Sequence, residues 1–147
     1  MKLDEAAITA LARRYRRWAR EHGLTRSDSA GDRFEGRILN RDVVFTTWLG
    51  GSTPNPPEIV VSSALDVDVP VLLPTHGREP PRSKTISLLR EVLDLEGVYN
   101  LGLTSRFVRI TFAPGTEPEL LDGALDALEQ RLRLLADPGE SGLPYRS

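Results

Sequence analysis

The spacing of apolar residues changes from a helical to a strand-like period and back along this chain, and that order limits the folds open to it. A helix-like segment comes first, three strand-like runs follow, and a second helix, a β-hairpin and a last helix complete the sequence. The order α-βββ-α-ββ-α predicts an α+β fold with an antiparallel five-stranded sheet and three helices mainly on one side. We expect one domain over residues 1–136 and a flexible C-terminal tail at 137–147.

The first helix has the clearest pattern. Asp4 can cap a helix that runs to about His22, and Gly23 supplies the left-handed residue that ends it. Spacings of three and four place one set of side chains on a single stripe: Ile8, Leu11, Tyr15, Trp18 and His22.

Two later segments also carry helix signals. Ser83 or Thr85 can cap the second helix. Thr116 and Glu119 have capping-box spacing at the start of the third, whose leucine stripe extends to about Ala136.

The strand-like runs have a period of two. Residues 33–49 read as two strands with a turn at Asn40-Arg41, and residues 59–71 read as a third strand with one buried and one wet face. Residues 98–103 and 107–112 read as a hairpin.

Composition restricts the classes of function. The net charge of −2 argues against a general nucleic-acid binder, and no apolar run approaches the roughly 20 residues of a membrane span. The absence of cysteine excludes a disulfide scaffold and thiolate zinc sites. No standard catalytic, phosphate-binding or metal-binding motif occurs, so we predict no catalytic residue, no cofactor and no metal. The N-terminus lacks the basic-then-apolar order of a signal peptide, which indicates a cytoplasmic protein.

The second predicted strand supplies the strongest candidate for a protein interface. If Phe45 faces the core, then Val44, Thr46 and Trp48 lie on the other face of the sheet. Three helices can cover one face and leave this one open or paired, and a tryptophan-centred apolar surface is typical of an interface hot spot. The alternative is a register shift of one residue, which would turn Trp48 into the core.

Basic residues form a second candidate surface. One group gathers on a single side of the first helix and can contact an anion, a nucleic acid, an anionic membrane surface or an acidic partner: Arg13, Arg16, Arg17 and Arg20. Arg82 and Lys84 lie at the start of the second helix, where free amides can help to hold an anion. The alternatives are a solvated helix face and a capped, proline-stiffened connection.

The other polar residues indicate little chemistry. His22 can bond to the last carbonyl groups of the first helix, and His76 stands alone in a loop. Asp66 and Asp68 share a strand face that is wet, so neither has the burial that acid–base catalysis needs. A small enzyme whose Asp, Glu and Arg side chains converge from distant positions stays open as an alternative.

The element order over residues 4–136 resembles the fold of class I type III secretion chaperones and of YbjN-like proteins. Those families are small, acidic and non-enzymatic, and many form dimers that bind an extended partner chain. The resemblance therefore implies a non-enzymatic protein-binding module, a chaperone, adaptor or regulatory partner, which binds another protein or forms a homodimer.

We expect Trp48→Ala to weaken association by about 2 kcal/mol or more, as for a hot-spot tryptophan, and to leave the monomer folded. Sedimentation measures the association, and circular dichroism checks the fold. An unfolded variant would place Trp48 in the core.

Overall fold

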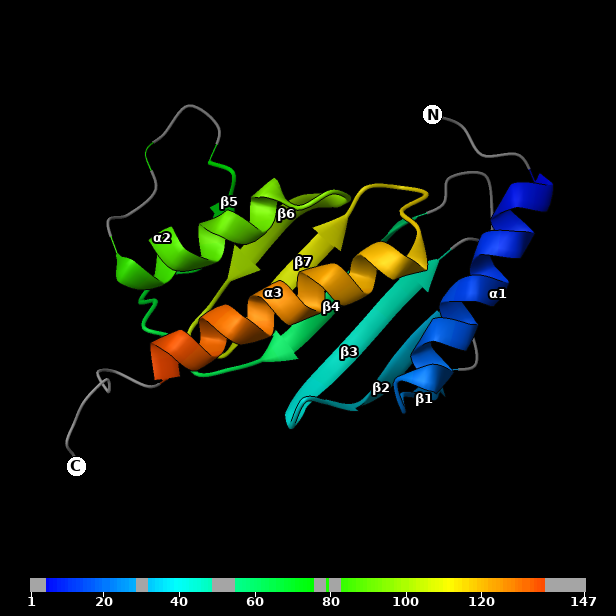
Figure 1. The fold of residues 1–147 in the computed structure, drawn as a ribbon, viewed down its shortest axis with the longest axis horizontal. Helices are drawn as coiled ribbons and strands as arrows, with labels where there is room; N and C mark the ends of the chain where they lie inside the picture. The colour runs from blue at the N-terminus through cyan, green and yellow to red at the C-terminus, as the bar shows by residue number, and fades with distance from the viewer. Residues whose placement is uncertain (1–4, 29–31, 49–54, 76–78, 80–82, 137–147) are drawn as a thin grey trace.

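In the residues that the structure describes, seven strands form one antiparallel sheet, and three α-helices lie on one of its faces (Figure 1). The computed structural model describes residues 5–28, 32–48, 55–75, 79 and 83–136. The helices are α1 (Glu5–Glu21), α2 (Lys84–Leu89), the short 3-10 helix η1 (Arg90–Asp94) and α3 (Pro118–Ala136). The strands are β1 (Thr25–Asp28), β2 (Asp32–Ile38), β3 (Arg41–Trp48), β4 (Asn55–Ser62), β5 (Val71–Leu73), β6 (Val98–Leu103) and β7 (Phe107–Phe112). Their spatial order is β1-β2-β3-β4-β7-β6-β5.

The α+β class, the antiparallel sheet and the three helices are confirmed, but the predicted number of five strands is wrong. One of the additional strands is β1, which pairs with β2 at the edge of the sheet. Its sequence, TRSD, has no apolar residue and therefore no alternation to reveal it. The predicted tail at 137–147 lies outside the described residues.

The other additional strand arises because the run at 59–71 is two strands. β4 ends at Ser62, and the amides of Ser63 and Leu65 then bond to carbonyl groups of the β6–β7 turn. The chain thereby crosses the ends of β7 and β6 and forms β5 at the far edge of the sheet. Local alternation continues through this connection, but strand pairing does not.

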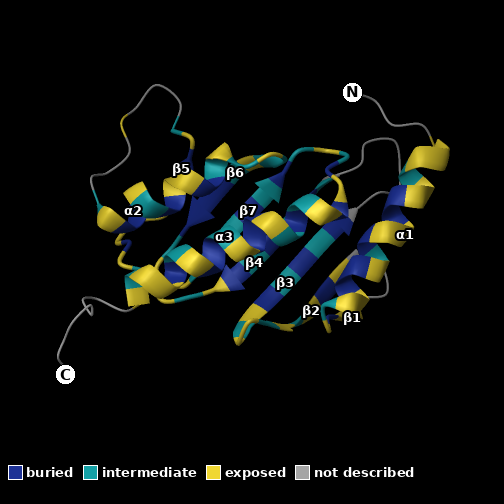
Figure 2. Ribbon diagram, in the orientation of Figure 1, coloured by how far each residue is buried: buried dark blue, intermediate teal, exposed yellow. Residues whose placement is uncertain are grey.

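Alternate strand residues face the helices and form the core, as the dark blue bands along β3 and β7 show (Figure 2). Phe45 of β3 is fully buried, and the ring centroids of Tyr15 and Trp18 of α1 lie 5.8 and 5.1 Å from its own. The predicted stripe of α1 is confirmed at Leu11, Tyr15 and Trp18, which are buried. Fully or nearly fully buried leucines of α3 complete the layer, including Leu121 and Leu128.

The β2–β3 turn lies one residue earlier than predicted. Ile38 pairs with Arg41, so Leu39 and Asn40 connect the strands. Both have positive φ angles, 53° and 66°, as a two-residue turn that matches the twist of the strands requires. Asparagine tolerates this conformation better than leucine does.

The predicted helix ends are right in part. The Ser83 hydroxyl accepts a hydrogen bond of 3.0 Å from the Ile86 amide and caps α2. The predicted capping box of α3 is wrong, because α3 begins at Pro118 and Glu117, not Thr116, precedes its first residue. The Thr116 hydroxyl donates to the Ala113 carbonyl at 2.6 Å. Glu119 is bound to Arg14 of α1.

Gly36 lies where the segment that follows α1 closely approaches β2. A Cβ atom at Gly36 would lie 3.0 Å from the Gly23 carbonyl oxygen and 3.0 Å from Cδ2 of Leu24. We expect Gly36→Ala to lower the free energy of unfolding by about 1–3 kcal/mol, because backbone must move. Urea denaturation measures the change.

Gly123→Ala is the matched control. Gly123 lies exposed within α3, and its added Cβ would meet nothing within 4 Å. Alanine should raise the stability there by about 0.5–1 kcal/mol. Equal effects at the two positions would contradict the close approach at Gly36.

Candidate functional site

The strand residues that alternate with the core form a second face, over which the structure describes no helix (Figure 1). The strand register aligns these residues in rows across the sheet. One row comprises Glu35, Val44, Val60, Arg109, Gly102 and Leu72. The next comprises Arg33, Thr46, Glu58, Thr111 and Asn100. We call these two rows the uncovered face.

Two of the three predicted interface residues lie on the uncovered face. Val44 and Thr46 are half-buried there, and the neighbouring Phe45 and Thr47 are buried on the helix side. The parity predicted for β3 is therefore right. The register shifts between Thr46 and Trp48, and the side chain of Trp48 lies outside what the structure describes. That these residues form an interface remains a prediction.

Charged side chains at the margin of this face are paired. Arg33 Nε lies 3.1 Å from Glu35, and Arg37 lies 3.5 Å from Asp42. Hydrogen bonding from Ser27, aided by Arg33, lowers the pKa of Glu35 below its ordinary value. Towards the centre the face is half-buried and partly apolar, with Val44 and Val60 side by side.

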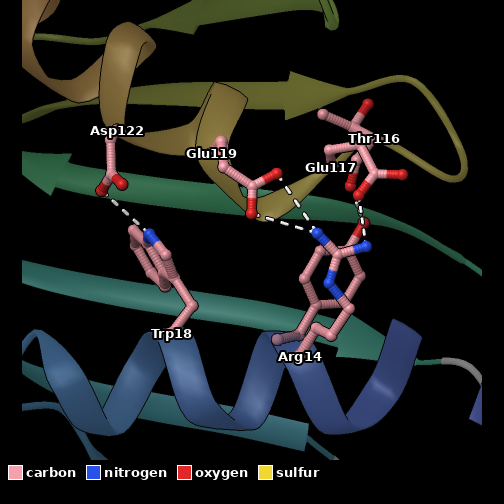
Figure 3. Close-up of polar contacts among 7 residues, drawn as sticks. Arg14, Trp18, Thr116, Glu117, Glu119 and Asp122 are labelled. Carbon is pink, nitrogen blue, oxygen red and sulfur yellow. Dashed lines mark hydrogen bonds and ion pairs between the residues drawn. The ribbon is translucent and has the colours of Figure 1, made fainter. Parts of the chain in front are cut away.

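A second polar arrangement joins α1 to the start of α3 (Figure 3). Arg14 pairs with Glu117 and with both oxygens of Glu119, at 3.0 and 3.2 Å. Hydrogen bonding to Glu117 raises the pKa of Arg14 above its ordinary value. The buried Tyr15 hydroxyl donates to the Thr116 carbonyl at 2.6 Å, and burial raises its pKa.

The same junction continues one turn further along α1. Trp18 Nε1 donates to Asp122 Oδ1 at 2.9 Å, and the same oxygen lies 2.7 Å from His22 Nε2. His22 Nδ1 bonds to the Trp18 carbonyl at 2.7 Å, so the predicted structural role of His22 at the helix end is confirmed. The imidazole also stacks on the Trp18 ring, with centroids 4.2 Å apart.

A cleft of about 340 Å³ lies at this junction, and Arg14, Arg17, His22, Glu119 and Asp122 are among its lining residues. It is the kind of concave cluster of Asp, Glu and Arg that a small enzyme would need. Its Glu119 and Asp122, however, hold α1 against α3 through the contacts described above. The geometry therefore supports a structural junction.

The predicted basic surface is only partly assembled. Arg13, Arg17 and Arg20 are exposed on α1, whereas Arg16 is half-buried. Lys84 is exposed at the start of α2, and Arg82 lies outside the described residues. Because α3 lies between α1 and α2 in the helical layer, the structure does not bring Lys84 to the arginines of α1 (Figure 1).

The remaining predicted candidates do not assemble into a site. Asp66 and Asp68 are exposed in the connection between β4 and β5 and do not share a strand face as expected. In the described part of the chain, no group of three or more His, Asp or Glu side chains could hold a metal ion. None of the helices in these ranges is long and apolar enough to cross a membrane.

The sequence did not reveal one buried ion pair, which joins α3 to the start of β3. Glu129 is 8% exposed, and its carboxylate accepts hydrogen bonds from Arg41 at 2.6 Å and from Arg133 at 2.8 Å. Burial raises the pKa of Glu129, but the two arginines outweigh burial and hold the pKa below its ordinary value. The spacing of Glu129 and Arg133 is visible in the sequence, whereas Arg41 comes from a distant element.

We expect Glu129→Gln to lower the free energy of unfolding by about 1–3 kcal/mol at neutral pH, because Arg41 loses its ionic partner. Since the pKa of Glu129 is lower in the folded state, its stabilisation is present above the ordinary carboxyl pKa and is lost as pH falls through the folded pKa. Urea denaturation of wild type and variant from neutral to acid pH should show the two stabilities converge. Glu96→Gln, at an exposed position, is the control. If the difference in unfolding free energy between wild type and Glu129→Gln were the same at every pH, the stabilising ion pair assigned to Glu129 would be contradicted.

Comparison with known proteins adds a likeness of fold. No protein-family model matches the chain, and no curated protein matches it. Among solved structures it is similar to the crystal structure of the mycobacterial trehalose monomycolate transport factor A, with a TM-score of 0.57 and 14% identity. The match covers 86% of this chain and 94% of that one. At this identity the likeness shows the shared fold, and function must be argued from the site.

Proposed function

We propose that this chain is a non-enzymatic protein-binding module whose binding surface is the uncovered face. The observation that carries the proposal is the one-sided placement of α1, α2 and α3 on the sheet (Figure 1). The partner is a protein, either another chain or a second copy. The module would serve as a chaperone, an adaptor or a regulatory partner.

The composition of the uncovered face supports this proposal. An antiparallel sheet can expose one face to water, and such a face is then typically polar. Here Val44 and Val60 lie next to each other at the middle of a row that ends at Leu72, whose exposed fraction is 50%. Removing apolar surface from water is favourable by roughly 25 cal/mol per Å², before the entropic cost of association is subtracted. Polar and charged residues surround the valines, as in the rim of many interfaces.

The structural neighbour and the resemblance in element order both agree with a non-enzymatic binding role. The structurally similar mycobacterial protein is named as a transport factor. The element order resembles that of type III secretion chaperones and YbjN-like proteins, which bind other proteins and are not enzymes. These likenesses support a binding function of this general kind for the chain, and the uncovered face is where we place it.

Site-directed crosslinking tests the proposal. The chain has no cysteine, so a single introduced cysteine can carry a photoactivatable label at a chosen position. Val60→Cys places the label on the uncovered face, and Gln130→Cys places it on the exposed side of α3. In an extract of the source cells we expect covalent adducts from position 60 and few from position 130.

Mass spectrometry of the adducts identifies the partner as another protein or as the chain itself. Circular dichroism of both labelled proteins confirms that they are folded. Adducts that form only from position 130 would move the binding surface to the helical layer and contradict the proposal.

A further inference from the structure

Arg109 is a cation near the centre of the uncovered face without an ion-pair partner in the part of the chain that the structure describes. It belongs to β7 and lies between Val60 of β4 and Gly102 of β6. Its guanidinium group extends over Gly102, where an added Cβ would lie 2.9 Å from Nη2 and 3.2 Å from Nε. Arg109 Nε is buried and has no hydrogen-bond partner. Glycine at position 102 therefore provides room for a cation whose buried Nε has no hydrogen-bond partner.

Glu58 is the matching anion in the neighbouring row. It pairs with Thr111 across β4 and β7, and the Thr111 hydroxyl donates to its carboxylate at 3.5 Å, the limit for a hydrogen bond. Glu58 and Arg109 are diagonal neighbours, for which side chains are attached about 7–8 Å apart. No ion pair joins these two residues within the chain. Both side chains are half-buried.

These central charges restrict what can cover the face. At the margin of the face, Arg33 pairs with Glu35 and Arg37 pairs with Asp42 within the chain, so these residues do not require opposite charges from a partner. An apolar partner laid over Glu58 and Arg109 would leave two unpaired charges away from water, which is strongly unfavourable. A favourable partner must present an acid opposite Arg109 and a base opposite Glu58.

We propose that the partner is a second copy of this chain, bound face to face so that Arg109 of each copy pairs with Glu58 of the other. A two-fold axis that lies between the faces, midway between the two residues, generates both pairs at once. Val44 and Val60 then meet the partner's apolar side chains beside the ion pairs. The guanidinium group can bind the carboxylate through two hydrogen bonds, which fixes the orientation of the copies. The inference rests on the proposed function and names its partner.

Charge reversal followed by mixing tests the pairing. We expect the wild type to be a dimer by sedimentation, and Arg109→Glu and Glu58→Arg each to weaken self-association by at least about 30-fold, as for loss of a buried charge partner. An equimolar mixture of the two variants should restore a dimer, because each interface pair again joins a Glu to an Arg. The double variant Arg109→Glu/Glu58→Arg should also form a dimer by itself.

Arg13→Glu is the control, since Arg13 is exposed on α1 and the helical layer lies away from the interface. It should sediment as the wild type does, and circular dichroism should show every variant folded. A wild type that is monomeric at all concentrations, or a mixture that stays monomeric, overturns the second-copy inference. Crosslinking from position 60 to a different protein would then leave the proposed function intact, whereas the absence of any adduct there would overturn both.

Discussion

Alternation of side chains along the antiparallel strands governs both the core and the candidate binding surface. Because Phe34, Phe45, Ile59 and Ile110 point to the helices, the residues between them must point to the opposite side. The same register that stacks the core therefore aligns Val44, Val60 and Arg109 in a row across the sheet. A slip of one residue in any central strand would exchange the two faces, so the core and the proposed binding surface depend on one constraint.

The helical layer depends on polar as well as apolar contacts. Arg14, Tyr15 and Trp18 of α1 each bond to the start of α3, and Glu129 further along α3 bonds to Arg41 of β3. The exposed Arg14 pairs contribute little individually, since water screens them. The buried Tyr15 hydrogen bond and the Glu129 ion pair are less screened and more directional. They orient α1 and α3 on an apolar layer that by itself would permit several orientations.

The likeness to a mycobacterial transport factor concerns the fold and does not identify a partner for this chain. At 14% identity, few side chains are common to both proteins, and a fold of this class can carry different partners. If the uncovered face binds a partner as we propose, the specificity of this chain comes from its own residues on that face. The central Arg109 and Glu58 are then more informative than the fold, because they limit which surfaces can bind there.

Local periodicity in the sequence by itself determined α1, α3, the hairpin of β6 and β7, and the parity that places Val44 and Thr46 opposite the core. Each of these depends on residues close together in the chain. Tertiary structure alone decided that β1 pairs with β2, that the run at 59–71 divides into β4 and β5, and that Arg14 binds the acids of α3. It likewise decided that Glu58 and Arg109 become neighbours, 51 positions apart in the sequence. Strand pairing and ion pairing between distant segments depend on the free energy of the whole fold. The residue pattern within one segment does not indicate which distant segment it will contact.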